Sequence, residues 1–264
     1  MSRQSVPRVP SDVSRLRRWR QKATLLLAAA TGPRRIAKRL FPPPTLTSFD
    51  VGEHPGVRGH VALSVDDAFW SGASPGVPMV DEVRRLLARH GARATFFVML
   101  DGCVDVDPAA VQALLEDGHE LANHCVSDRP YHEASASEFG DALLATQRRI
   151  IELQGRAPPW FRAPHGRLSA TMLRTLEEHD LRHVMMDGYA EDPFVPDARF
   201  VGRFLARHAQ HGSILLIHMP ERGYREWNFD ALDILLTGLA AKGLRAVTVT
   251  ELSQRATTSP TLSR

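Results

Sequence analysis

The sequence lacks the features that mark several common protein classes. It has only two cysteines, Cys103 and Cys125, and no Cys-x-x-Cys pair, so neither a disulfide framework nor a cysteine-based structural zinc site is expected. No apolar run approaches the ~18–20 residues that cross a bilayer. Residues 45–264 contain no internal repeat, and no glycine-rich phosphate loop follows the first predicted strand, which argues against a nucleotide-binding domain.

Basic charge is concentrated at one end of the chain. The 264 residues carry a net charge of +3, but residues 1–44 hold 11 basic residues and one acid. The remaining 220 residues have 22 basic and 29 acidic groups, a net charge of −7. Because the charge that binds nucleic acid must lie on the folded domain, we expect no nucleic-acid partner.

The sequence divides into a basic extension at 1–44, a domain at 45–254 and a short tail at 255–264, with Pro42–Pro44 at the first junction. Residues 23–32 form an uncharged stretch about as long as the apolar segment of a signal peptide. The extension also fits an organellar transit peptide, a basic amphipathic helix with membrane contact, or an unstructured tail. We therefore expect a secreted, cell-envelope or organelle-targeted protein. The sequence indicates no oligomeric state.

From about residue 60, strand and helix patterns alternate about seven times, which predicts βαβ units and a parallel sheet. The expected strands are His60–Val65, Ala94–Met99, Glu120–Asn123, Trp160–Arg162, Leu181–Met186, Ile214–Ile217 and Arg245–Val249. The expected helices include Pro108–Glu116, a capped helix between Ser135 and Gly155, Phe200–His208 and Phe229–Ala241. An α/β barrel of seven units is favoured, and a doubly wound open sheet is the alternative.

Polar residues follow two of these strands with the chemistry of a metal site. Asp66 and Asp67 end the first strand, and neighbouring carboxylates can divide their roles into metal ligand and general base. His124 ends the third strand, with Asp128 four residues later. Asp67, His124 and Asp128 would form a three-ligand site open to water.

Further polar residues follow the later strands. Arg162 ends the fourth strand and could orient a catalytic carboxylate, while Gly166 would let the backbone bend toward a reacting oxygen. Asp192 could pair with Arg162, and His218 emerges from an apolar strand as a candidate general acid. Each residue alone also fits a structural role, but their gathering at one end of five strands favours catalysis. The loop at 221–227 has aromatic residues that could stack on sugars, although ordinary loop packing is the preferred interpretation.

These segments resemble the NodB-like polysaccharide deacetylases of carbohydrate esterase family 4 over about residues 56–254. The resemblance rests on segments similar to that family's motifs, namely Ser64-Val-Asp-Asp-Ala68, Arg93-Ala-Thr-Phe-Phe-Val98, Gly118-His-Glu-Leu-Ala-Asn-His124, Arg162-Ala-Pro-His-Gly166, Asp192, Leu215-Leu-Ile-His218 and the strand that precedes Leu252. The resemblance implies a distorted (β/α)7 barrel and a metal-dependent hydrolase that deacetylates an N-acetylglucosamine-type carbohydrate, such as a chitin-like polymer.

The resemblance also implies a role for each residue. Asp66 is the general base, and His218 is the acid that protonates the leaving amine. Arg162 tunes Asp66 while Asp192 holds Arg162, and the backbone N–H of His165 joins the metal in stabilising the oxyanion. The metal ligands are Asp67, His124 and Asp128. We expect zinc, and cobalt, manganese or iron would suit the same ligands.

Five positions depart from the family pattern. Asp128 stands where a second ligand histidine is usual, which adds negative charge and would make the metal a weaker Lewis acid. Ala68 and Phe69 replace Gly-Pro, His165 replaces Tyr, and Cys125, predicted to be buried packing, replaces Ser or Thr. Two alternatives therefore remain: an amidohydrolase for small non-sugar amides, and a carbohydrate-binding barrel with weakened catalysis.

Overall fold

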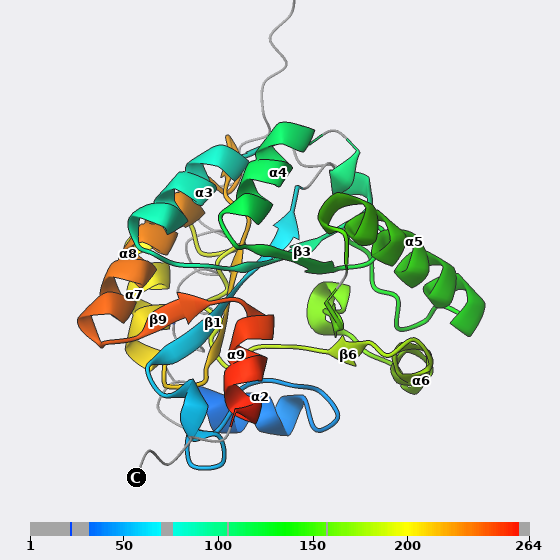
Figure 1. Cartoon of the computed structure of the whole chain (residues 1–264), viewed down its shortest axis with the longest axis horizontal. Helices are drawn as coiled ribbons and strands as arrows, with labels where there is room; N and C mark the ends of the chain where they lie inside the picture. The colour runs from blue at the N-terminus through cyan, green and yellow to red at the C-terminus, as the bar shows by residue number, and fades with distance from the viewer. Residues whose placement is uncertain (1–21, 23–31, 70–75, 105, 157, 259–264) are drawn as a thin grey trace, which may run out of the picture.

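The computed structural model describes residue 22 and residues 32–69, 76–104, 106–156 and 158–258. A seven-stranded sheet forms its centre (Figure 1), in the order β6-β5-β4-β3-β1-β7 with β9 also paired to β1. The strands are β1 His60–Ala68, β3 Thr95–Val98, β4 Glu120–Asn123, β5 Trp160–Phe161, β6 Arg182–His183, β7 Ile214–His218 and β9 Arg245–Val247. Every pairing between them is parallel, as the alternation predicted.

The curled sheet closes through irregular backbone where a continuous strand was expected. The predicted strand Leu181–Met186 is regular only at β6, and the chain then pairs with β7 through a parallel bridge between Gly188 and Leu215. A Cβ atom on Gly188 would lie 2.4 Å from the end of the Leu215 side chain, so a larger residue here would displace that side chain. The result is a distorted (β/α)7 barrel, as predicted.

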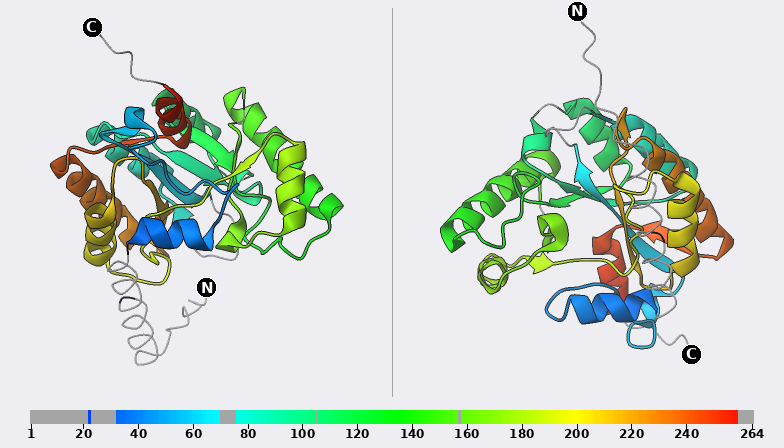
Figure 2. Two further views of the ribbon diagram at one scale, coloured as in Figure 1. Left: turned by 90° about the horizontal axis from the view of Figure 1, so that it is seen from below. Right: turned by 180° about the vertical axis from the view of Figure 1, so that it is seen from behind.

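Helices surround the sheet on its outside (Figures 1 and 2). They are α3 Val80–Arg89, α4 Pro108–Glu116, α5 Ala136–Gln154, α6 Ala170–Glu178, α7 Ala198–His208 and α8 Trp227–Ala241. The predicted cap of α5 is confirmed, because the Glu138 backbone N–H donates to the Ser135 hydroxyl and Gly155 ends the helix with φ 76°.

The described residues include two further helices, of which α9 was not predicted and α2 lies in the extension, where an amphipathic helix was one of the alternatives. The segment after β9 forms α9, Val249–Thr257, and the Glu251 backbone N–H donates to Thr248, the Thr-x-x-Glu spacing of a capping box. Within the predicted basic extension, α2 covers Pro33–Leu40. Residues 1–21 and 23–31 of that extension lie outside the described residues.

The strands are buried in the core, and their carboxyl ends carry the polar residues of the candidate site. Leu63 and Val65 on one face of β1 and Ala62 and Ser64 on the other are all fully buried, as expected for a strand covered on both faces. Cys125 is also fully buried, within a cluster that includes Phe139 and Phe161, which confirms that it packs in the interior.

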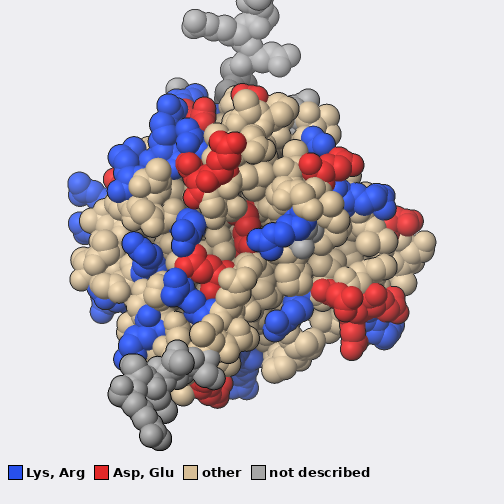
Figure 3. Space-filling view, in the orientation of Figure 1, with Lys and Arg blue, Asp and Glu red and all other residues tan. Residues whose placement is uncertain are grey.

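The described helices and the surface add two observations about partners. None of the helices in the described ranges is long and apolar enough to cross a membrane. Figure 3 shows acidic and basic side chains interspersed on one face of the molecule.

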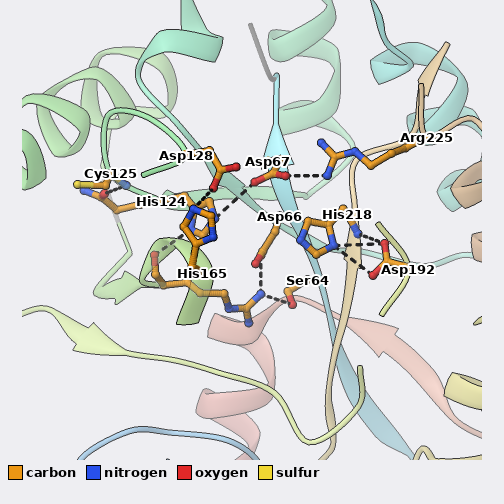
Figure 4. A network of polar contacts seen from close by, with 12 residues as sticks. Ser64, Asp66, Asp67, His124, Cys125, Asp128, His165, Asp192, His218 and Arg225 are labelled. Atoms are coloured by element: carbon orange, nitrogen blue, oxygen red, sulfur yellow. Dashed lines mark hydrogen bonds and ion pairs between the residues drawn. The ribbon is translucent and has the colours of Figure 1, made fainter. Parts of the chain in front are cut away.

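An additional sheet of two short strands lies beside the end of β1. Its strands, β2 Val77–Pro78 and β8 Glu221–Arg222, are antiparallel. It carries the loop at 221–227 back over the barrel, and the side chain of Arg225 from this loop reaches Asp67 (Figure 4).

Candidate active site

The polar strand ends converge on one cavity, as the parallel sheet requires. A cavity of about 1080 Å³ is lined by Asp66, Asp67, His124, Arg162 and His218, among other residues. Asp66 and His218 are register partners on β1 and β7, which places the predicted base and acid on adjacent strands. Figure 4 shows their side chains directed into the same space.

Arg162 holds Asp66, as predicted. Its Nη1 donates to Asp66 Oδ1 at 2.6 Å and to the Ser64 hydroxyl at 2.8 Å. Arg162 is 1% exposed, lies over the Phe97 ring and also donates to the Val184 carbonyl oxygen, so the guanidinium is fixed. Burial lowers the pKa of Arg162 and the charge of Asp66 opposes this, leaving a cation beside the carboxylate.

Asp192 corrects a prediction, because it holds His218 and not Arg162. Its Oδ1 lies 3.1 Å from His218 Nδ1, and its Oδ2 accepts the His218 backbone N–H at 2.8 Å. Asn228 donates to Asp192 Oδ2 at 2.7 Å, and Trp227 Nε1 donates to the Asp192 carbonyl oxygen. With Nδ1 occupied by Asp192, His218 has Nε2 for proton transfer.

The predicted metal ligands divide into a pair that fits and one that does not. His124 Nδ1 lies 2.8 Å from the Arg162 carbonyl oxygen, an arrangement that fixes the ring and leaves Nε2 as a ligand. His124 Nε2 lies 3.6 Å from Asp67 Oδ1, so one cation could contact both. Asp128 instead lies 3.2 Å from His165 Nε2. Among the described residues, no group of three His, Cys, Asp or Glu side chains is placed to hold a metal.

Asp67 and His124 each favour the charged form of the other. Burial would raise the pKa of Asp67, but the hydrogen bond to His124 and the charges of His218 and Arg225 hold it far below its usual range. Burial would lower the pKa of His124, but Asp66 and Asp67 raise it. A proton and a metal ion therefore compete for His124 Nε2.

Arg225 is a residue of the site that the sequence did not indicate. Its Nη1 donates to Asp67 Oδ2 at 2.7 Å, and its Nε donates to Glu221 Oε1 at 2.9 Å. Arg225 is 4% exposed and Glu221 is fully buried. The loop had been interpreted as ordinary packing, and its spacing offers no signal because Asp67 lies 158 residues earlier.

Strained backbone gathers at the same strand ends. Asp67 has φ 52°, Cys125 has φ 65° and His165 has φ 57°, although none of these residues is glycine. The Cys125 backbone N–H donates to the Asn123 side chain at 2.8 Å, which holds the turn that follows β4. The predicted bend at Gly166 is present as the 3-10 turn Pro164–Gly166. Such strain is typical of functional sites, where the surrounding structure holds it in place.

Comparison with known proteins assigns the family. The family model described as polysaccharide deacetylase matches residues 54–184. The Listeria monocytogenes peptidoglycan-N-acetylglucosamine deacetylase PgdA is 30% identical over 219 residues, which are 82% of this chain and 43% of that protein. A Bacillus cereus peptidoglycan-N-acetylglucosamine deacetylase is 27% identical over 208 residues, covering 78% of this chain and 93% of that protein. The chain belongs to the NodB-like polysaccharide deacetylases.

Solved structures confirm the fold of this polysaccharide deacetylase. The Bc1960 peptidoglycan N-acetylglucosamine deacetylase superposes with a TM-score of 0.69 at 23% identity, covering 79% of this chain and 92% of that one. A Bacillus anthracis protein described as a family 4 pseudoenzyme superposes with a TM-score of 0.67 at 20% identity, covering 80% of this chain and 69% of that one. Because the fold occurs in both, activity must be argued from the site itself.

The His218–Asp192 pair predicts the alkaline limit of the deacetylase's activity. Burial would lower the pKa of His218, but the charge and hydrogen bond of Asp192 raise it from 6.5 to about 9. An acid must be protonated to act, so kcat/KM should persist toward pH 9 and fall above it. In Asp192→Asn the stabilising charge is lost, and the alkaline limb should move toward or below pH 6.5.

The measurement is kcat/KM between pH 5 and 10 for both proteins. Asp233→Asn is the matched control, because Asp233 is an exposed partner of His90 and does not line the cavity. An alkaline limb that is the same in Asp192→Asn and wild type would contradict His218 as the acid.

Proposed function

We propose that the protein hydrolyses the acetamido group of N-acetylglucosamine residues in a peptidoglycan-type glycan. One observation carries this proposal: Asp66 and His218 are register partners on adjacent strands, and each contacts a residue of opposite charge. Asp66 accepts a hydrogen bond from the Arg162 guanidinium, and His218 contacts the Asp192 carboxylate. A proton acceptor and a proton donor therefore face one cavity. Relatives named as peptidoglycan-N-acetylglucosamine deacetylases support the choice of glycan.

The residues divide the hydrolysis between them. Asp66 removes a proton from the attacking water, and Arg162 orients Asp66 and balances its charge. His218 delivers the proton on Nε2 to the departing amine, and Asp192 keeps the ring oriented through Nδ1. The backbone N–H of His165 is the proposed donor to the oxyanion.

The proposal includes a divalent metal, with zinc as the expected ion, and Asp67 and His124 are the residues that would hold it. When bound, the metal polarises the amide carbonyl and lowers the pKa of the attacking water. Asp128 stays a predicted third ligand, and it would have to leave His165 to reach the other two.

The direct test is acetate release from peptidoglycan fragments and from N-acetylated chito-oligosaccharides by zinc-loaded protein. We expect release from both, with the peptidoglycan fragment preferred, and loss of release after chelation that zinc restores. Release only from small non-sugar amides would favour the amidohydrolase alternative instead.

A carbohydrate-binding barrel is the second candidate, and the Asp128–His165 contact favours it because it leaves two ligands at the proposed metal position. Glycan binding by the metal-loaded protein without acetate release would support this candidate and contradict deacetylation.

A further inference from the structure

Part of the cavity has a chemistry that deacetylation does not need. Beside the catalytic residues, the cavity is lined by apolar side chains from α2 and from the segments after β6, namely Ile36, Ala37, Leu40, Phe41, Met185, Met186, Phe194 and Phe204. A volume of about 1080 Å³ matches the upper range of pockets that enclose whole ligands. Apolar walls offer no partners to sugar hydroxyls, so they favour an aliphatic group.

One wall of this apolar region comes from the predicted extension. Pro33, Ile36, Ala37 and Leu40 line the cavity, and their spacing places them on a single face of α2. Arg34 fixes the helix, because its Nε donates to Asp187 Oδ2 at 2.8 Å and its Nη2 to the His211 carbonyl oxygen at 3.0 Å. Figure 2 shows α2 in blue, crossing the barrel as a separate helix. The basic extension therefore contributes to the site.

The other face of α2 is cationic. Arg35, Lys38 and Arg39 are exposed, and the helix contains no acidic residue. Two apolar cavity residues are also exposed, Leu40 by 66% and Phe194 by 51%. A basic amphipathic helix with exposed apolar side chains beside it suits an anionic lipid surface.

We propose that the same site also accepts a glycolipid, in which an N-acetylglucosamine unit at Asp66 and His218 carries an aliphatic chain that lies against α2. This inference rests on the proposed function and names a further substrate class. The sugar would occupy the polar strand ends, and the chain would lie against apolar residues of the same cavity, among them Met185, Leu40 and Phe194. Each buried methylene of the chain adds to affinity, and the unbranched Met side chains can adapt to it.

The test compares octyl and methyl β-N-acetylglucosaminides as monomers in solution. We expect kcat/KM to be about tenfold or more higher for the octyl compound, because several methylenes leave water. In the Leu40→Ser/Phe194→Ser double variant this octyl-to-methyl ratio should fall toward one. Val104→Ser is the matched control, since Val104 is an exposed apolar residue, 74% accessible, that does not line the cavity, and it should keep the wild-type ratio.

The outcomes separate this inference from the proposed function. Deacetylation of both compounds at equal efficiency would overturn the glycolipid assignment while supporting deacetylation. A wild-type octyl preference that survives in the double variant would also overturn it, because the chain would then lie elsewhere. Failure to release acetate from either compound would count against the proposed function alone. In that case calorimetric binding of the two compounds decides the glycolipid inference, with equal affinities overturning it.

Discussion

Asp66→Asn is expected to lower kcat/KM for acetate release by about 10²–10⁴-fold. The asparagine keeps an oxygen that can accept from Arg162 Nη1, so the cavity should retain its shape, but the amide cannot take a proton from water. Metal content should not change, because Asp66 is not one of the residues that would hold the metal. The measurement combines acetate release with metal analysis of the same preparation.

Asp67→Asn is the comparison that makes this result specific. Asp67 is the adjacent residue and the proposed metal ligand, so this variant should lose metal as well as activity. Asp66→Asn removes the charge that balances Arg162, and Asp67→Asn removes one that balances Arg225, so either variant can lose stability. Thermal unfolding of both variants measures that loss separately from activity. Full activity in Asp66→Asn would remove Asp66 from the role of base, and loss of metal in that variant would reassign it as a ligand.

Arg225→Met is expected to reduce the free energy of unfolding by about 3–5 kcal/mol. The variant removes the cation that contacts both Asp67 and Glu221, which are 7% and 0% exposed. Two buried carboxylates would then lie close together without the guanidinium, and methionine offers no donor to either. Urea denaturation at neutral pH measures the loss through the transition midpoint.

Arg222→Met provides the matched control for this variant. Arg222 lies three residues earlier in the same loop, but its side chain is 57% exposed and pairs with Glu82 at the surface. Such a pair contributes about 1 kcal/mol or less. The double variant Glu221→Gln/Arg225→Met should be more stable than Arg225→Met, because one of the two buried charges is gone. Equal stability of Arg222→Met and Arg225→Met would contradict a buried ionic network at Asp67.

Much of the fold could be predicted because it depends on local pattern. Apolar strands alternating with capped helices indicated the parallel barrel, and the Ser135 cap and Gly155 terminus of α5 were confirmed. The same logic put Asp66, His124, Arg162 and His218 at one edge, since parallel strands present their carboxyl ends together. By contrast, α9 was missed because its capping box followed an apolar strand without a break.

The site's partners could not be predicted in the same way. Asp192 was assigned to Arg162 because both follow strands and carry opposite charge, yet it holds His218. Asp128 follows His124 at a spacing that suits a second metal ligand, yet its side chain contacts His165. Opposite charges at one edge allow several pairings, and only the direction in which each loop leaves its strand selects among them.

The sequence by itself indicated the barrel through its periodicity, and its short contiguous motifs indicated the family and predicted the acid and the base. The tertiary structure alone decided that Arg225 pairs with Asp67, 158 residues earlier in the sequence. It also decided that Arg34 of the basic extension pairs with Asp187, 153 residues later. Such contacts leave no local pattern, since each depends on how the whole chain brings distant loops to the same cavity. Apolar residues of α2, which the sequence placed in a separate extension, thereby line the same cavity as Asp66 and His218.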